Sequence, residues 1–211
     1  FFPDYFAGMD LNIPESGNAL PDIVDEALWG LDCYRRMQTP DGGIRGGIES
    51  SEHPRLGEAS WQESLDVMAY APGVWSSYIY AGVAARAAGW LEGRDPALAD
   101  VYRESALRAM KWAENRRKQE ADRKYPSQVN DARNLAAAEL FRLAGDKRWN
   151  GLFLETTKLK GPHPVLFVWK DHDQGDAAFV YARTDRSGMD EQVKRNCVSA
   201  VSYTHLRAHE T

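Results

Sequence analysis

The stretch IPESGNALPDIVDEALWGLDCYRRMQ, residues 13–38, followed by TPDGGI, residues 39–44, decides the fold of this chain. Its apolar residues recur at spacings of three and four and lay one stripe along a helix. The stripe consists of Leu20, Ile23, Val24, Ala27, Leu28, Leu31 and Tyr34. Pro21 suits the first turn of this helix, and Pro40 with the pair Gly42-Gly43 ends it. The stretch therefore predicts a helix with one buried face.

The same stretch resembles glycoside hydrolase family 9, the cellulase-type enzymes. In that family an asparagine precedes a Pro-Asp-aliphatic-aliphatic-Asp-Glu helix, which ends in Met-Gln and a Gly-Gly turn. The matching residues here are Asn18, Pro21, Asp22, Ile23, Val24, Asp25, Glu26, Trp29, Gly30, Leu31, Asp32, Met37, Gln38, Asp41, Gly42 and Gly43. A weaker likeness extends to about Ala200. The resemblance implies a toroid of six inner and six outer helices, of which about half fits into this chain.

Further helices are expected from apolar periodicity, caps and breakers along the rest of the chain. Their approximate ranges are 76–88, 96–117, 130–144, 147–157, 176–183 and 188–200. Two-residue alternation is scarce, so the sequence predicts an all-α fold of antiparallel helix pairs, a partial (α/α)6 barrel. The domain is expected to span residues 1–200.

Residues 201–211 differ from the preceding sequence, because they lack a sustained apolar stripe and contain two of the five histidines. They resemble a translated sequencing adaptor, so we expect them to be non-native. At the other end, Phe1-Phe2-Pro3 offers neither an initiating methionine nor a signal peptide, and we expect the native N-terminus to lie upstream.

Composition is that of an ordinary globular protein, with 211 residues, 43% hydrophobic content and a net charge of −5. Mixed charges without long basic blocks argue against nucleic acid as a partner. No apolar run is long enough to span a membrane. Cys33 and Cys197 lack metal-ligand spacing and are expected to be small buried residues, with a disulfide between them as the lesser alternative.

The resemblance implies hydrolysis of a β-glycosidic bond with inversion, in which one carboxylic acid protonates the leaving oxygen and a separate carboxylate activates water. In the family the base belongs to an Asp-Ala-Gly-Asp motif before the first helix, and the acid is a glutamate near the end of the domain. Neither motif occurs in this chain. Asp4 and Asp10 flank an Ala-Gly pair at a different spacing, and we expect them to serve the loop. The carboxylates at the start of the helix, Asp22, Asp25 and Glu26, are explained by the helix dipole.

No catalytic residue is therefore assigned, and we expect the catalytic base to lie before Phe1. The 211 residues are expected to be inactive without the missing base and acid.

Candidate substrate-binding residues occupy the region from Ile44 to Tyr78. Flat aromatic rings stack on the C–H face of a sugar, and neighbouring polar side chains bond its hydroxyls. The stacking candidates are Trp61, Trp75 and Tyr78, and the hydroxyl-binding candidates are Arg45 and Gln62. Where many family members have Tyr-His-Lys after the Gly-Gly turn, this chain has Arg45-Gly46-Gly47. This departure from the family pattern argues against recognition of ordinary cellulose.

No metal or cofactor is expected. Asp171-His172-Asp173 with Asp176 could suggest a divalent ion, but the spacing matches no calcium loop, and a solvated turn followed by an N-cap explains it better.

The sequence thus predicts part of a glycoside hydrolase acting on a β-linked glucan or related saccharide, secreted or periplasmic by resemblance. Two alternatives stay open: a non-catalytic helical binding scaffold, and another α-toroid carbohydrate enzyme such as a lyase or an epimerase. The oligomeric state cannot be read from the sequence.

Overall fold

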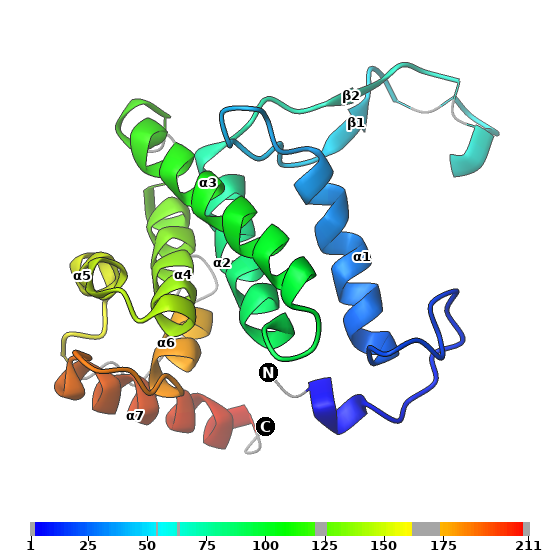
Figure 1. Ribbon diagram of the computed structural model, residues 1–211. Helices are drawn as coiled ribbons and strands as arrows, with labels where there is room; N and C mark the ends of the chain where they lie inside the picture. Colours follow the sequence, from blue (N-terminus) through cyan, green and yellow to red (C-terminus); the bar gives the residue numbers. More distant parts are fainter. Residues whose placement is uncertain (1–2, 54, 63, 121–125, 162–173, 209–211) are drawn as a thin grey trace.

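Helices form most of the fold. The computed structural model describes residues 3–53, 55–62, 64–120, 126–161 and 174–208. Within these ranges the α-helices are α1 (Asp22–Arg36), α2 (Val74–Leu91), α3 (Pro96–Glu120), α4 (Pro126–Ala144), α5 (Lys147–Thr156), α6 (Gly175–Ala182) and α7 (Glu191–Ala208) (Figure 1). Two 3-10 turns, η1 (Pro3–Phe6) and η2 (Ser60–Gln62), and two short antiparallel strands, β1 (Ile48–Ser50) and β2 (Val67–Ala69), complete these elements. The predicted all-α fold is confirmed.

The first helix begins at Asp22, and Pro21, which was predicted to lie in its first turn, is its N-cap. The carboxylate of Asp22 is buried and accepts hydrogen bonds from Leu11 N at 2.8 Å and Ser16 Oγ at 2.5 Å. These bonds, first that of Ser16, hold the pKa of Asp22 below its ordinary value. Asp22 thus orders the preceding segment, a role that the helix-dipole interpretation did not include.

The turn after α1 is fixed against α3. Gly42 has a φ of 111°, and a Cβ at this position would lie 2.7 Å from the backbone oxygen of Arg108. Gln38 Nε2 donates to the backbone oxygens of Gly42, at 2.9 Å, and of Ser105, at 3.0 Å. A glycine is therefore required both by the left-handed backbone and by the lack of space.

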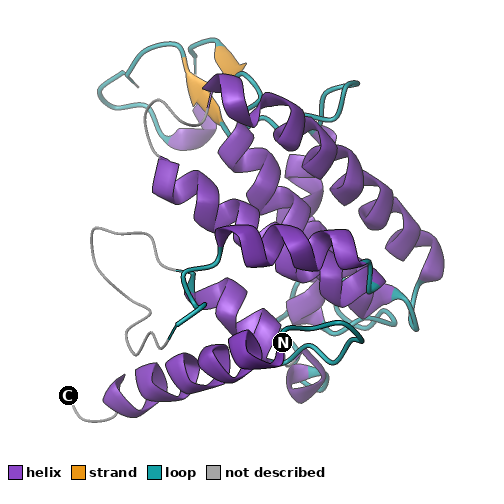
Figure 2. Cartoon of the chain, turned by 90° about the vertical axis from the view of Figure 1, so that its left-hand side faces the viewer, coloured by secondary structure: helices purple, strands orange, loops and turns teal. Residues whose placement is uncertain are grey.

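Three helix pairs follow one another along the chain: α2 with α3, α4 with α5, and α6 with α7. Contacts between α2 and α4 and between α4 and α6 join the pairs side by side (Figures 1 and 2). The approach of α2 to α4 depends on small residues, since a Cβ on Gly82 would lie 3.3 Å from Ala136 Cα. The arrangement confirms antiparallel helix pairs, with α2, α4 and α6 forming one layer.

Helix α4 is covered by neighbouring helices over most of its surface. Arg133 and Glu139, charged residues that alternate with apolar ones in the sequence, are both buried. Glu139 is paired with Arg86 Nε at 2.5 Å and Arg142 Nη2 at 2.8 Å. Since α4 packs against α2, α5 and α6, little of its surface is left for solvent, and ion pairs neutralise the buried charges.

Three sequence-based expectations have different outcomes. Both cysteines are free, but only Cys197 is buried, so the expectation that Cys33 is buried was wrong. Helix α7 continues to Ala208, while the non-native origin of residues 201–211 stays a prediction. The possible metal ligands Asp171, His172 and Asp173 lie outside the described residues.

None of the helices in the described ranges is both long and apolar enough to cross a membrane.

Candidate functional site

One end of the helix array gathers the beginnings of α2, α4 and α6. Near the start of α2, Tyr78 donates its hydroxyl to Glu114 of α3 at 2.6 Å. On α4, Asn134 Nδ2 donates to the backbone oxygen of Phe153 in α5 at 2.9 Å. Before α6, Gln174 Nε2 donates to the backbone oxygen of Thr156 at 2.9 Å. The three N-termini therefore lie beside the C-terminal ends of α3 and α5, and we call this region the inner-helix end.

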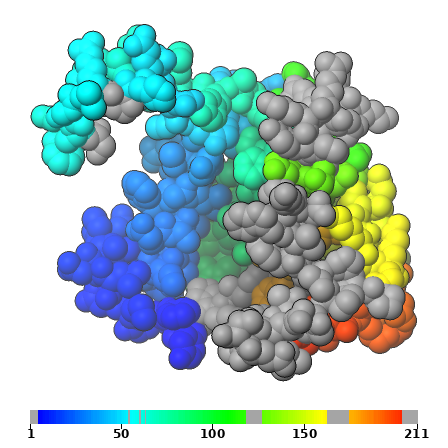
Figure 3. Space-filling view, turned by 180° about the vertical axis from the view of Figure 1, so that it is seen from behind, coloured from blue at the N-terminus to red at the C-terminus, as the bar shows by residue number. Residues whose placement is uncertain are grey.

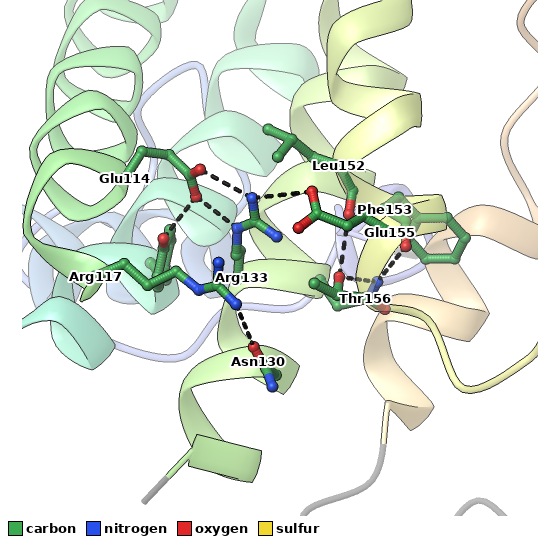
Figure 4. A network of polar contacts seen from close by, with 10 residues as sticks. Glu114, Arg117, Asn130, Arg133, Leu152, Phe153, Glu155 and Thr156 are labelled. Carbon is green, nitrogen blue, oxygen red and sulfur yellow. Dashed lines mark hydrogen bonds and ion pairs between the residues drawn. The ribbon is translucent and has the colours of Figure 1, made fainter. Parts of the chain in front are cut away.

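An ion-pair network around the buried Arg133 supports the inner-helix end (Figure 4). The guanidinium of Arg133, only 3% exposed, donates to both carboxylate oxygens of Glu114, at 2.6 and 2.9 Å, and contacts Glu155 at 3.4 Å. Arg117 Nη2 donates to Asn130 Oδ1 at 3.2 Å. The network joins α3, α4 and α5 at the level where α2 begins.

The ionisable groups of the network shift each other's pKa values. Burial alone would raise the pKa of Glu114, but hydrogen bonds from Arg133 and Tyr78 outweigh it and hold that pKa below its ordinary value. Burial, together with the bond to Glu114, raises the pKa of Tyr78. Glu114 is therefore ionised and Tyr78 protonated at neutral pH.

Sequence reasoning missed this network. One signal could have found it: Arg133 stands four residues from Val129 and from Ala137, and both of these apolar residues are buried. A charge in line with apolar residues on a helix face requires a partner when that face is covered. The partner, Glu114, lies on another helix and could not be identified from spacing.

Hydrogen bonds join the residues before the β1–β2 hairpin to the first turn of α2. Ser77 Oγ accepts from Ile44 N at 2.9 Å, and Ser76 Oγ donates to Ile44 O at 2.8 Å. Arg45 pairs with Pro72 in an isolated bridge, and its Nη1 donates to Tyr70 O at 2.8 Å. The described residues between Ile44 and Trp75 thus include a short hairpin whose flanking residues are hydrogen-bonded to α2.

The structure separates the five predicted substrate-binding residues into three groups. Trp75 lies in the first turn of α2, is 48% exposed and lines a pocket of about 370 Å³ together with Gly46, the residue after Arg45. Trp61, 85% exposed, and Gln62 belong to η2, on a segment that projects away from the helices (Figures 1 and 3). Tyr78 is fully buried, so its ring has no open face for a sugar here.

Arg45, through its bridge to Pro72, and Trp75 both lie near the first turn of α2, and none of the observed contacts tests sugar binding at the five positions. Among the described residues, no group of three or more histidine, cysteine, aspartate or glutamate side chains is arranged to hold a metal ion.

Comparisons with known proteins agree on one family. The sequence model described as Glycosyl hydrolase family 9 matches residues 4–209. Endoglucanase C of Cellulomonas fimi is 29% identical over 169 residues, which cover 68% of this chain and 14% of that protein. A xyloglucan-specific endo-beta-1,4-glucanase of Bacteroides ovatus is 50% identical over 44 residues, 20% of this chain and 8% of that protein.

A solved structure, a metagenome-derived family 9 endoglucanase, has the same fold with a TM-score of 0.78 and 24% identity. The match covers 94% of this chain but only 37% of the other. The chain thus spans a minor part of the length of its relatives. Because the family model matches nearly the whole chain, the chain belongs to glycosyl hydrolase family 9.

Proposed function

We propose that the protein to which these 211 residues belong hydrolyses a β-linked glucan or a related saccharide by inverting acid/base chemistry. The observation that carries this proposal is the family match over residues 4–209. The two curated relatives, an endoglucanase and a xyloglucan-specific endo-glucanase, support a β-glucan as the substrate class. The 211 residues supply helical scaffold and lack the paired catalytic carboxylates that inversion requires.

The experiment compares the 211-residue chain with the full-length protein on carboxymethyl-cellulose and xyloglucan, with reducing ends and product anomers followed by NMR. The full-length protein should release α-configured ends from the β-linked substrate. The 211-residue chain should release none. Activity of the shorter chain would refute its assignment as inactive scaffold, and retention of configuration would refute the mechanism.

We propose further that the inner-helix end contributes to sugar binding through Trp75, which stacks on a sugar ring, and Arg45, which bonds its hydroxyls. Half of the Trp75 surface is open, and the pocket beside it can admit part of a sugar. Trp61 and Gln62 would reach a longer substrate from the projecting segment. Tyr78 contributes only as a donor to Glu114, because it is buried.

Replacing Trp75 with alanine in the full-length protein should weaken saccharide binding by about tenfold, the value of one stacking contact of roughly 1.4 kcal/mol. Isothermal titration with cello-oligosaccharides measures the change. Trp29→Ala is the matched control, because Trp29 is also exposed but belongs to α1 and lines neither of the two pockets beside that helix. Equal affinities of the two variants would remove Trp75 from the site.

Secretion or periplasmic location is part of the proposal and is supported by family membership alone. Fractionation of cells that produce the full-length protein tests it, and recovery in the cytoplasm would contradict it.

A further inference from the structure

A polar pocket of about 280 Å³ lies between the turn after α1 and the exposed side of α3. The turn packs directly on the helix here, since a Cβ on Gly43 would lie 2.6 Å from Trp112 Cε2. The described residues that line the pocket are one residue of the turn, Asp41, and five residues of α3, Arg108, Lys111, Trp112, Asn115 and Arg116. We call this feature the turn–α3 pocket.

Two hydrogen bonds fix the carboxylate of Asp41 in this pocket. Thr39 Oγ1 donates to Asp41 Oδ1 at 2.6 Å, and Trp112 Nε1 donates to Asp41 Oδ2 at 2.9 Å. These bonds, first that of Thr39, hold the pKa of Asp41 below its ordinary value, so the group is ionised at neutral pH. Each carboxylate oxygen can accept more than one hydrogen bond. Asp41 therefore keeps the capacity to accept bonds from hydroxyl groups of a ligand.

Positive charge predominates in the turn–α3 pocket. Three cationic side chains, those of Arg108, Lys111 and Arg116, line it beside one carboxylate, so the formal charge of its described lining is +2. Lys111 and Asn115 are both exposed, and neither has a hydrogen bond or ion pair with another residue in the described part of the chain. The pocket thus offers an ammonium group and an amide to a ligand, within the positive field of two guanidinium groups.

The combination of groups in the pocket indicates the class of ligand. Ammonium and guanidinium groups bind carboxylates and phosphates. An amide and a carboxylate, in contrast, bind hydroxyl groups, which both donate and accept hydrogen bonds. The volume is just below the roughly 300 Å³ at which pockets for drug-sized ligands begin, and a bare inorganic anion would fill only part of it. A single sugar ring that carries a carboxylate matches the pocket in size, charge and hydroxyl groups.

We propose that the turn–α3 pocket binds a uronic-acid residue of an acidic saccharide, with its carboxylate on Lys111 and its hydroxyl groups on Asn115 and Asp41. The site is separate from the inner-helix end, because Glu114 lies on the side of α3 that packs against α2, whereas the pocket lies on the exposed side. The choice of a saccharide rests on the proposed function, and the choice of an acidic one rests on the charge of the pocket.

Isothermal titration of the full-length protein with two disaccharides tests the site. Cellobiouronic acid differs from cellobiose only in one C6 carboxylate, which replaces a hydroxymethyl group. At low ionic strength the parent protein should bind the acid about tenfold more tightly than cellobiose, the value of one charge-assisted hydrogen bond. Lys111→Gln should remove this preference. Lys147→Gln is the matched control and should keep it, because Lys147 is also exposed on a helix but does not line the pocket.

Equal affinities of the parent protein for the two disaccharides would overturn the proposal, and so would equal losses of preference in the two lysine variants. Inorganic phosphate is the third probe. If phosphate displaces cellobiouronic acid from the parent protein at equal concentration, the pocket is a site for free anions, and the assignment of a uronic acid is refuted. Asn115→Ala should weaken binding of the acid about fivefold through the loss of a hydroxyl contact, and unchanged affinity would overturn that contact.

Binding to the turn–α3 pocket is measured without hydrolysis, so its failure is distinguishable from failure of the proposed function. A full-length protein that hydrolyses β-glucan but has no preference for cellobiouronic acid refutes the uronic-acid site alone. A full-length protein that has the preference, and loses it in Lys111→Gln, but hydrolyses no β-glucan refutes the proposed activity alone. Thermal melting of each variant verifies that it is folded.

Discussion

At the scale of single residues, Arg133 shows how a buried charge is made tolerable in a small-residue helix. Its guanidinium is almost fully enclosed, and two carboxylates from neighbouring helices, Glu114 and Glu155, neutralise it. Such a pair contributes little net stability compared with apolar packing, but breaking it leaves a buried charge. The network therefore fixes the relative positions of the helices at the inner-helix end.

Arg133→Ala should lower the free energy of unfolding by about 3 kcal/mol, because the half-buried carboxylate of Glu114 would lose the guanidinium that neutralises it. Urea unfolding followed by circular dichroism measures the change. Arg148→Ala removes a solvent-exposed pair with Asp146 and should cost about 1 kcal/mol or less. Equal losses of unfolding free energy in the two variants would show that the ion pairs of Arg133 contribute no more than a solvent-exposed pair.

Acid should destabilise the protein partly through Glu114. Its pKa is below the ordinary value of 4.5, so its contribution is complete above that pH and is lost as the pH falls through the folded-state pKa. Glutamine does not titrate, so Glu114→Gln removes the part of the pH dependence of stability that comes from Glu114. The loss of unfolding free energy between pH 5 and pH 3, roughly the range of carboxyl titration, should therefore be smaller in this variant than in the parent chain. Parallel pH profiles would contradict the assignment.

At the scale of elements, close contact between α2 and α4 sets the geometry of the layer. Gly82 allows this contact, since its α-carbon faces the backbone of Ala136 and the side chain of Leu135. Backbone atoms cannot rotate away as flexible side chains do, so an added methyl group requires a small shift of one helix relative to the other.

Gly82→Ala should therefore lower the melting temperature, with a cost of about 1 kcal/mol or more from overpacking. Gly151→Ala is the control within α5, where an added Cβ would meet nothing within 4 Å. This control should gain about 0.5–1 kcal/mol from the better helix propensity of alanine. Differential scanning calorimetry measures both, and a stabilising Gly82→Ala would show that the two helices can separate without loss.

At the scale of the whole molecule, an apolar groove of about 470 Å³ lies open between α1 and α2, with Ile23, Ala27 and Val83 in its lining. This α1–α2 groove should govern the behaviour of the isolated 211-residue chain. Apolar surface of this kind promotes association. The weight-average mass by light scattering should rise with protein concentration, and Ala27→Glu, a charge placed in the groove, should suppress the rise. Ala97→Glu adds the same charge to an exposed position of α3 and should have no effect. Association that persists in Ala27→Glu would place the contact elsewhere.

Much of the fold was predictable because it depends on local signals. Apolar periodicity located every described α-helix, and Asp95, which precedes Pro96 at the start of α3, accepts from Leu98 N at 3.0 Å. The ends were less accurate, since α2 and α4 begin before the predicted residues, where packing extends a helix beyond its local pattern. The five substrate-binding positions stay predictions, and the structure shows that Trp61 and Trp75 share a segment of sequence but not a location.

The sequence by itself determined the helices, the Gly-Gly exit after α1 and the family, since each follows from residues that are close together in the chain. Only the tertiary structure decided that Arg133 and Glu139 are buried, that Tyr78 is enclosed and that the α1–α2 groove is open. The reason is physical: periodicity states which face of a helix can be covered, but burial and charge pairing depend on neighbours that are distant in sequence.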